Sequence, residues 1–160
     1  MKTIIIGLGN PILGDDGVGW RVVEELEGHT LAMGVETDQM ASGGIGLMER
    51  LVGYERAIIV DAIATGSFPT GSVRIFPLEA LENSFAGHLG SPHESNLQTA
   101  LQVGRDLGAS LPDQITIVAI ESPYVYDFSN ELSPDVAQAI PTAVQAVIEQ
   151  ISKENPGGDR

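Results

Sequence analysis

Apolar residues follow two patterns along this chain. Short, nearly continuous runs such as Ile4-Ile5-Ile6 are typical of strands that are buried on both faces of a sheet. Elsewhere, apolar residues recur every three or four positions, as they do from Val18 to Leu26, and this spacing predicts an amphipathic helix. Gly7-Leu8-Gly9 lies between the two, so we expect the chain to open with a strand, a tight turn and a helix.

The same alternation continues to the end of the chain. We expect further strands at 34–38, 56–61, 73–77 and 115–120, and helices at 47–51, 97–107 and 134–151. The strand at 73–77 is expected at an edge of the sheet, because Pro77 cannot donate a hydrogen bond to a neighbouring strand. Alternating strands and helices predict a three-layer α/β sandwich around a mostly parallel sheet.

The ends of the last helix and the long connections complete this prediction. Ser133 is expected to cap the final helix, Pro134 to occupy its first turn, and Pro141 to kink or split it. Residues 79–92 and 121–132 are expected to form loops. We expect one domain at 1–152, followed by a frayed polar tail at 153–160.

Composition excludes several classes of function. The chain of 160 residues has 22 acidic and 8 basic side chains and a formal net charge of -14, which argues against nucleic acid as a partner. It contains no cysteine, which excludes disulfides, thiolate metal sites and a cysteine nucleophile. No signal peptide and no apolar stretch of about 18 residues is evident, so we expect a cytoplasmic protein without a membrane segment.

Three polar residues are candidates for chemistry. Asp16 stands where the first strand passes into its helix, Asp61 ends the strand at 56–61, and His93 precedes the helix at 97–107. In an open α/β sheet all three can lie at the carboxyl ends of the strands, where ligands bind. Two carboxylates and one imidazole suit a divalent transition metal.

Each candidate also has a purely structural interpretation. Asp15, the neighbour of Asp16, is expected to cap a helix or to interact with its dipole. His93 alone would be an ordinary loop histidine, whereas a buried acid such as Asp61 is harder to explain by packing. Asn10 and the Gly43-Gly44 pair can serve turn geometry alone. Dinucleotide, Walker, Gly-x-Ser-x-Gly and His-Glu-x-x-His motifs are all missing from the sequence.

Several of these segments together resemble a known family. Those segments are Gly7-Leu8-Gly9-Asn10, Asp15-Asp16-Gly17-Val18-Gly19, Val60-Asp61-Ala62, Ser91-Pro92-His93, Ser133-Pro134 and Pro141. In combination they are similar to the hydrogenase maturation endopeptidases. The resemblance implies a single domain with an about five-stranded sheet, in which one edge strand can run antiparallel. It also implies an enzyme that removes the C-terminal extension of a [NiFe]-hydrogenase large-subunit precursor after nickel insertion.

The resemblance further implies roles for individual residues. The metal-contacting trio of the family maps onto Asp16, Asp61 and His93, and the first of these positions is Glu or Asp in the family. Either Asp16 or Asp61 would act in catalysis, with metal or carboxylate activating the water. Nickel would be supplied by the precursor rather than stored in the enzyme, which is expected to be a monomer.

One loop departs from the family pattern. Where the family usually has Asp-Gly-Gly-Thr, this chain has Ser42-Gly43-Gly44-Ile45. Backbone freedom is therefore retained at Gly43 and Gly44, but the acid and the hydroxyl are missing. Gly43 and Gly44, together with Asn10, are expected to contact the substrate. The sequence around Ser91-Pro92-His93 resembles the corresponding segment of family members that serve cytoplasmic, NAD-linked hydrogenases.

Two alternative functions remain at this point. Gly7-Leu8-Gly9-Asn10-Pro11 is also similar to the start of peptidyl-tRNA hydrolases, but that class needs a histidine after the turn and a basic face for tRNA. This chain has Asp15-Asp16 there and a strongly acidic composition. A nickel-binding accessory module that docks on the precursor without cutting it would use the same three residues. Cleavage of a nickel-loaded precursor would distinguish the enzyme from this module.

Overall fold

The computed structural model describes residues 1–81, 97–123 and 127–153, and its elements follow the predicted alternation. In chain order they are β1 (Thr3–Leu8), η1 (Gly14–Gly17), α1 (Val18–Leu26), β2 (Val35–Met40), α2 (Gly44–Leu51), β3 (Arg56–Ile63), β4 (Val73–Pro77), η2 (Leu78–Ala80), α3 (Leu97–Asp106), β5 (Gln114–Glu121) and α4 (Pro134–Ser152). None of these helices combines the length and the apolar character needed to cross a bilayer.

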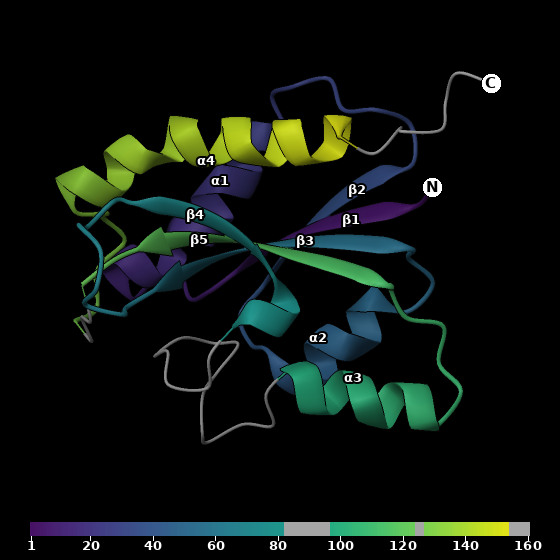
Figure 1. Cartoon of the computed structure of the whole chain (residues 1–160). Helices are drawn as coiled ribbons and strands as arrows, with labels where there is room; N and C mark the ends of the chain where they lie inside the picture. The colour runs from purple at the N-terminus through teal and green to yellow at the C-terminus, as the bar shows by residue number, and fades with distance from the viewer. Residues whose placement is uncertain (82–96, 124–126, 154–160) are drawn as a thin grey trace.

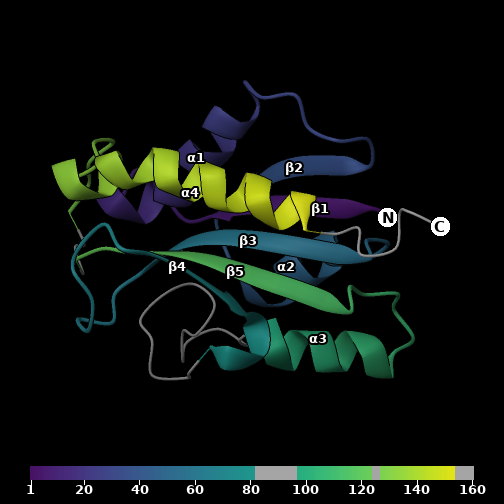
Figure 2. The same cartoon turned by 45° about the horizontal axis from the view of Figure 1, so that its top comes forward.

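The strands form one five-stranded sheet in the order β2-β1-β3-β5-β4. The first four strands are parallel, and β4 runs antiparallel to β5. Strand β4 lies at an edge of the sheet, the position that Pro77 at its end predicts. Helices α1 and α4 cover one face of the sheet, and α2 and α3 cover the other (Figures 1 and 2). The predicted three-layer α/β sandwich, with β1, β3 and β5 as adjacent central strands, is confirmed.

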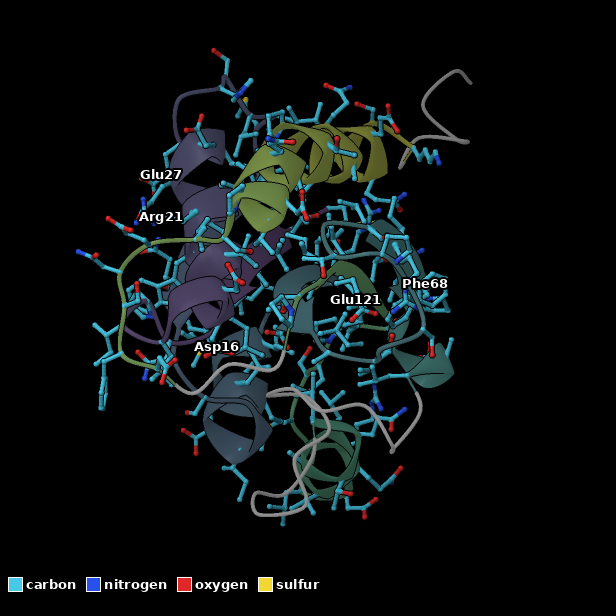
Figure 3. All side chains as sticks on the ribbon, turned by 90° about the vertical axis from the view of Figure 1, so that its left-hand side faces the viewer. Asp16, Arg21, Glu27, Phe68 and Glu121 are labelled. Carbon is cyan, nitrogen blue, oxygen red and sulfur yellow. The ribbon has the colours of Figure 1, made fainter. Side chains whose placement is uncertain are left out.

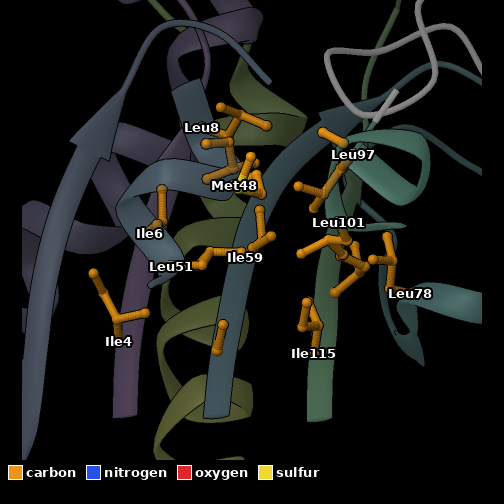
Figure 4. Close-up of a cluster of buried hydrophobic side chains, with 14 of the residues drawn as sticks. Ile4, Ile6, Leu8, Met48, Leu51, Ile59, Leu78, Leu97, Leu101 and Ile115 are labelled. Atoms are coloured by element: carbon orange, nitrogen blue, oxygen red, sulfur yellow. The ribbon is translucent and has the colours of Figure 1, made fainter. Parts of the chain in front are cut away.

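Burial on both faces explains the continuous apolar runs. All six residues of β1 and all eight of β3 are buried. Ile4, Ile6 and Leu8 lie in the core beneath α2 and α3, shown in Figure 4, whereas Ile5 lies in the core beneath α1 and α4. Successive side chains on a strand point to opposite faces, so each central strand supplies both cores.

The first turn of α1 approaches the ends of β1 and β3 so closely that no side chain fits at Gly19. A Cβ atom on Gly19 would lie 2.4 Å from the carbonyl oxygen of Val60 and 2.7 Å from that of Leu8. A Cβ atom on Gly7 would lie 2.3 Å from the carbonyl oxygen of Gly19. The two glycines therefore allow backbone to contact backbone, and they fix the start of α1 over the ends of β1 and β3.

A polar network joins α2 to the edge strand β2. The guanidinium of Arg50 donates from Nε to Asp38 at 2.6 Å and from Nη1 to the hydroxyl of Tyr54 at 3.1 Å. The hydrogen bond to Asp38, followed by that to Tyr54, raises the pKa of Arg50 above its ordinary value. Tyr54 in turn donates to Glu36, so the outer strand is tied to the helix that follows it.

Three sequence expectations need correction or limits. Strand β3 does not end at Asp61 but continues to Ile63, because it stays paired with β5 up to Glu121. Helix α4 continues through Pro141 and is not split there. Proline has no N–H to donate to the carbonyl of the preceding turn, but Pro141 is exposed, so water can reach that carbonyl. Of the loop expected at 79–92, only residues 79–81 are described, and the first two of them belong to η2. Of the tail expected at 153–160, only Lys153 is described.

Replacing Gly19 with alanine should destabilise the fold by about 1–3 kcal/mol, because its methyl group would overlap main-chain oxygens that cannot move independently. The matched control is Gly46→Ala. Gly46 lies inside α2 with nothing within 4 Å of its Cβ position, so alanine there should stabilise by about 0.5–1 kcal/mol. Urea unfolding of both variants measures the difference, and equal stabilities would contradict the close contact of α1 with the sheet.

Candidate active site

The candidate site lies at the edge of the sheet where β1, β3 and β5 end. Figure 3 shows this edge, with Asp16 and Glu121 facing the viewer and Phe68 on the side of β4. Chain segments that leave the carboxyl ends of parallel strands gather here, and this is where open α/β sheets bind ligands.

Asp16 is held by the turn that follows β1. It lies in the short helix η1, two residues before α1 begins, at the passage from the first strand to its helix. Its Oδ2 accepts the backbone N–H of Asn10 at 2.9 Å. Gly9 has a φ of 144°, and a Cβ atom on it would lie 2.0 Å from the carbonyl oxygen of Asp16. The loop therefore folds back tightly and fixes this carboxylate beside the end of β1.

Asp61 comes from the interior of β3, and only 4% of its surface is exposed. Ile59 and Ile63, two residues before and after it, lie in the core beneath α2 and α3, so Asp61 points to this face. Helix η1 contacts β3, which means that Asp16 and Asp61 belong to elements that touch at one edge of the sheet. A direct approach of the two carboxylates to one another stays a prediction.

The third predicted metal ligand, His93, lies outside the described residues. Within residues 1–81, 97–123 and 127–153, no three acidic or imidazole side chains come together as a group that could hold a metal ion. The described part of the site thus contributes the two carboxylates, and the imidazole stays a prediction.

The residues expected to contact the substrate have clear structural roles. Asn10 accepts the N–H of Ile12 through its Oδ1 at 3.2 Å, which closes the turn around Asp16. Gly44 begins α2 with a φ of 69°, a conformation that favours glycine, and Gly43 precedes it without a side-chain cap. Because α2 follows β2, its N-terminal end faces the same sheet edge. Contact of these residues with substrate remains a prediction.

Asp15 does not cap the helix that follows it. Its buried carboxylate, 6% exposed, accepts the backbone N–H of Ser133 at 2.7 Å and the hydroxyl of Ser133 at 2.9 Å. The expectation for Ser133 is corrected at the same time: it stands at the N-cap position of α4, but its hydroxyl is used by Asp15 and makes no cap of its own. A negative charge from η1 therefore lies at the N-terminus of α4.

Sequence reasoning missed a buried acid at this edge. Glu121, 2% exposed, is the last residue of β5 rather than the first of a loop. Its Oε2 accepts the N–H of Thr65 at 2.8 Å, and its Oε1 accepts the Thr65 hydroxyl. The available signal was an acid directly after an apolar run, the same signal that identified Asp61.

An open α/β sheet that carries acidic side chains at the carboxyl ends of its central strands is an arrangement suited to hydrolysis assisted by carboxylates or metal. Comparison with known proteins gives the family. A family model described as hydrogenase maturation protease, HycI, matches residues 20–150. The chain belongs to this family and is therefore a hydrolase.

Individual relatives agree with this assignment. The hydrogenase 2 maturation protease of Escherichia coli (strain K12) is 29% identical over 149 residues, which cover 92% of this chain and 89% of that protein. The solved structure of the E. coli hydrogenase maturating endopeptidase HybD superposes with a TM-score of 0.79 at 25% identity and covers 97% of this chain and 94% of that one. The [NiFe] hydrogenase maturation protease HybD from Thermococcus kodakarensis shares the fold, with a TM-score of 0.71, 24% identity and coverage of 94% and 99%. These relatives speak against the peptidyl-tRNA hydrolase alternative.

Replacing Asp15 with asparagine should destabilise the protein by about 1–3 kcal/mol, because two hydrogen bonds from Ser133 lose their charged acceptor. Asp135→Asn is the matched control, since Asp135 lies exposed in the first turn of the same helix, where its charge is close to the positive end of the helix dipole. Denaturant unfolding measures the loss of stability in low and in high salt. The loss should be small and weaker in high salt for Asp135→Asn, and larger and nearly independent of salt for Asp15→Asn. Equal effects would mean that the contact with Ser133 contributes nothing.

Proposed function

We propose that this protein removes the C-terminal extension of a [NiFe]-hydrogenase large-subunit precursor after nickel has been inserted. The acting form is a monomer in the cytoplasm. The observation that carries the proposal is the placement of Asp16 and Asp61 at one sheet edge in a chain of the hydrogenase maturation protease family.

The proposed recognition step uses the nickel ion of the precursor. Asp16 and Asp61 provide carboxylate oxygens, and His93 provides an imidazole nitrogen, a donor set that suits a divalent transition metal. Three donors leave coordination positions for ligands of the precursor, so the ion joins the two proteins only when it has already been inserted. Two features of the fold support this role: Asp16 is fixed by the N–H of Asn10, and Asp61 projects from a strand rather than a loop.

Hydrolysis requires that water adds its hydroxyl to the scissile carbonyl carbon and that its proton reaches the leaving amine. Asp16, Asp61 and His93 would hold the ion, which would supply Lewis-acid polarisation of the carbonyl or of the water. A carboxylate of this chain accepts the proton of the attacking water and passes it to the amide nitrogen. Asp16 is half-buried, whereas Asp61 is 4% exposed, so Asp16 is the carboxylate that solvent reaches more readily.

The decisive experiment follows trimming of the purified precursor by gel shift, with nickel present or withheld during its maturation. We expect one cut near the carboxyl terminus of the nickel-loaded precursor and none in the nickel-free form or in unfolded generic proteins. Asp16→Asn, Asp61→Asn and His93→Ala should each reduce trimming by at least about 100-fold, because each removes one contact to the same ion.

Asp113→Asn is the control variant. Asp113 is an exposed acid just before β5, at the opposite edge of the sheet, and its replacement should leave trimming unchanged. Equal trimming of the nickel-free precursor would exclude recognition through nickel but not the protease activity. Binding of the precursor without any cleavage would instead support the accessory module.

A further inference from the structure

Arg74 lies in one row with Asp61 across the sheet. In the strand register, Asp61 of β3 is paired with Ala119 of β5, and Ala119 is paired with Arg74 of β4. Directly paired residues point to the same face, so both charged side chains stand on the face covered by α2 and α3. Their Cα atoms are separated by two strand spacings, about 10 Å in all, and Ala119, whose side chain is a methyl group, is the residue between them in the row.

Two neighbours hold the guanidinium of Arg74 in place. The Oε1 of Glu121 lies 3.9 Å from Nη2, which is close enough for an ion pair but too far for a hydrogen bond. Glu121 is itself fixed by the backbone N–H and the hydroxyl of Thr65. The ring of Phe68, whose position Figure 3 shows, stacks on the guanidinium at 3.8 Å. The charge is therefore oriented without using its hydrogen-bond donors.

The donors that remain are Nε and Nη2 of Arg74. Both are buried, and neither has a hydrogen-bond acceptor among the described residues. These two atoms share one edge of the guanidinium and present parallel N–H groups, the geometry that binds a carboxylate through both of its oxygens. Buried donors without acceptors are unfavourable, and a substrate group that accepts both bonds would satisfy them.

We propose that Arg74 is a positioning residue that binds a carboxylate of the peptide substrate through Nε and Nη2. The inference rests on the proposed function and deepens it, because the row of paired strands places this carboxylate within a few residues of the bond held near Asp61. Because Nε and Nη2 are buried, the proposal requires the Phe68 ring, which is 44% exposed in the loop between β3 and β4, to shift when the substrate binds. Among the acceptors that an unmodified peptide carries, carboxylate alone matches both the two parallel donors and the positive charge.

The first test compares trimming kinetics of the nickel-loaded precursor. Arg74→Gln should raise KM about tenfold and leave kcat within about threefold, since it removes binding but no reacting group. Arg74→Lys keeps the charge but not the paired donors, and it should recover less than half of the loss. The control is Arg105→Gln, which removes an arginine that donates to the carbonyl of Pro112 away from this edge. Unchanged KM in Arg74→Gln overturns the proposal.

Competitor peptides distinguish the two sources of the carboxylate. A peptide that copies the removed extension is compared with its C-terminally amidated form and with a form whose acidic side chains are amides. Loss of inhibition on amidation of the terminus identifies the terminal carboxylate, and loss on side-chain replacement identifies an acidic residue. With the Arg74→Gln variant, the three peptides should inhibit equally. Equal inhibition of the wild-type protein by all three peptides overturns the proposal.

The second test does not depend on activity. The Nε–H resonance of Arg74 in ¹⁵N-labelled protein, assigned by its loss in Arg74→Lys, is followed during titration with acetate and with acetamide. We expect a saturable shift with acetate alone, whereas the other arginines change less. No shift, or the same shift for every arginine, overturns the proposal. If the wild-type protein fails to trim any precursor, the proposed function fails, and this titration still decides whether Arg74 binds a carboxylate.

Discussion

The carboxylate of Asp15 holds together the two loops that frame the candidate site. It joins η1, which follows the first strand, to Ser133 at the start of the last helix, 118 positions further along the chain. Two more contacts join the same two parts of the chain. Leu13 forms a β-bridge with Ser129, and the guanidinium of Arg21 donates to the carbonyl of Asn130. Because Asp16 is the next residue after Asp15, the position of the candidate ligand depends on this buried contact between the two ends of the fold.

The three buried acids at this edge have different surroundings, and this separates their roles. Asp15 is bound by a hydroxyl and an N–H group, and Glu121 by Thr65 and by the charge of Arg74. These two carboxylates are thus used within the fold, in holding elements together. Asp61 stands within β3, between Ile59 and Ile63 of the core beneath α2 and α3, and only 4% of its surface is exposed. In the proposed function, Asp61 contributes its carboxylate to the nickel ion that the precursor brings.

How much the sequence predicts depends on whether a feature is local. Apolar runs located β1, β3 and β5, an acid at the end of such a run located Asp61, and an acid between a strand and a helix located Asp16, because these signals lie within a few residues of the chain. The partner of Asp15 could not be found in this way, since nothing near residue 15 indicates Ser133. The row that joins Asp61 to Arg74 depends on the strand order, which places β5 between β3 and β4. Glu121 carried the same local signal as Asp61 and was nevertheless assigned to a loop.

Rows of paired residues across β3, β5 and β4 show where the apolar core ends and the polar site begins. One row, Ile59, Ile117 and Phe76, is apolar and packs beneath α2 and α3. The next row on the same face, two residues nearer the carboxyl end of β3, is Asp61, Ala119 and Arg74. The change from core to polar site thus takes about 7 Å along the strands. Both charged groups of this row stand on strands that the core beneath them holds rigid, whereas only Asp16 depends on a turn. The separation between the Cα atoms of Asp61 and Arg74 is consequently set by the spacing of the strands in the sheet.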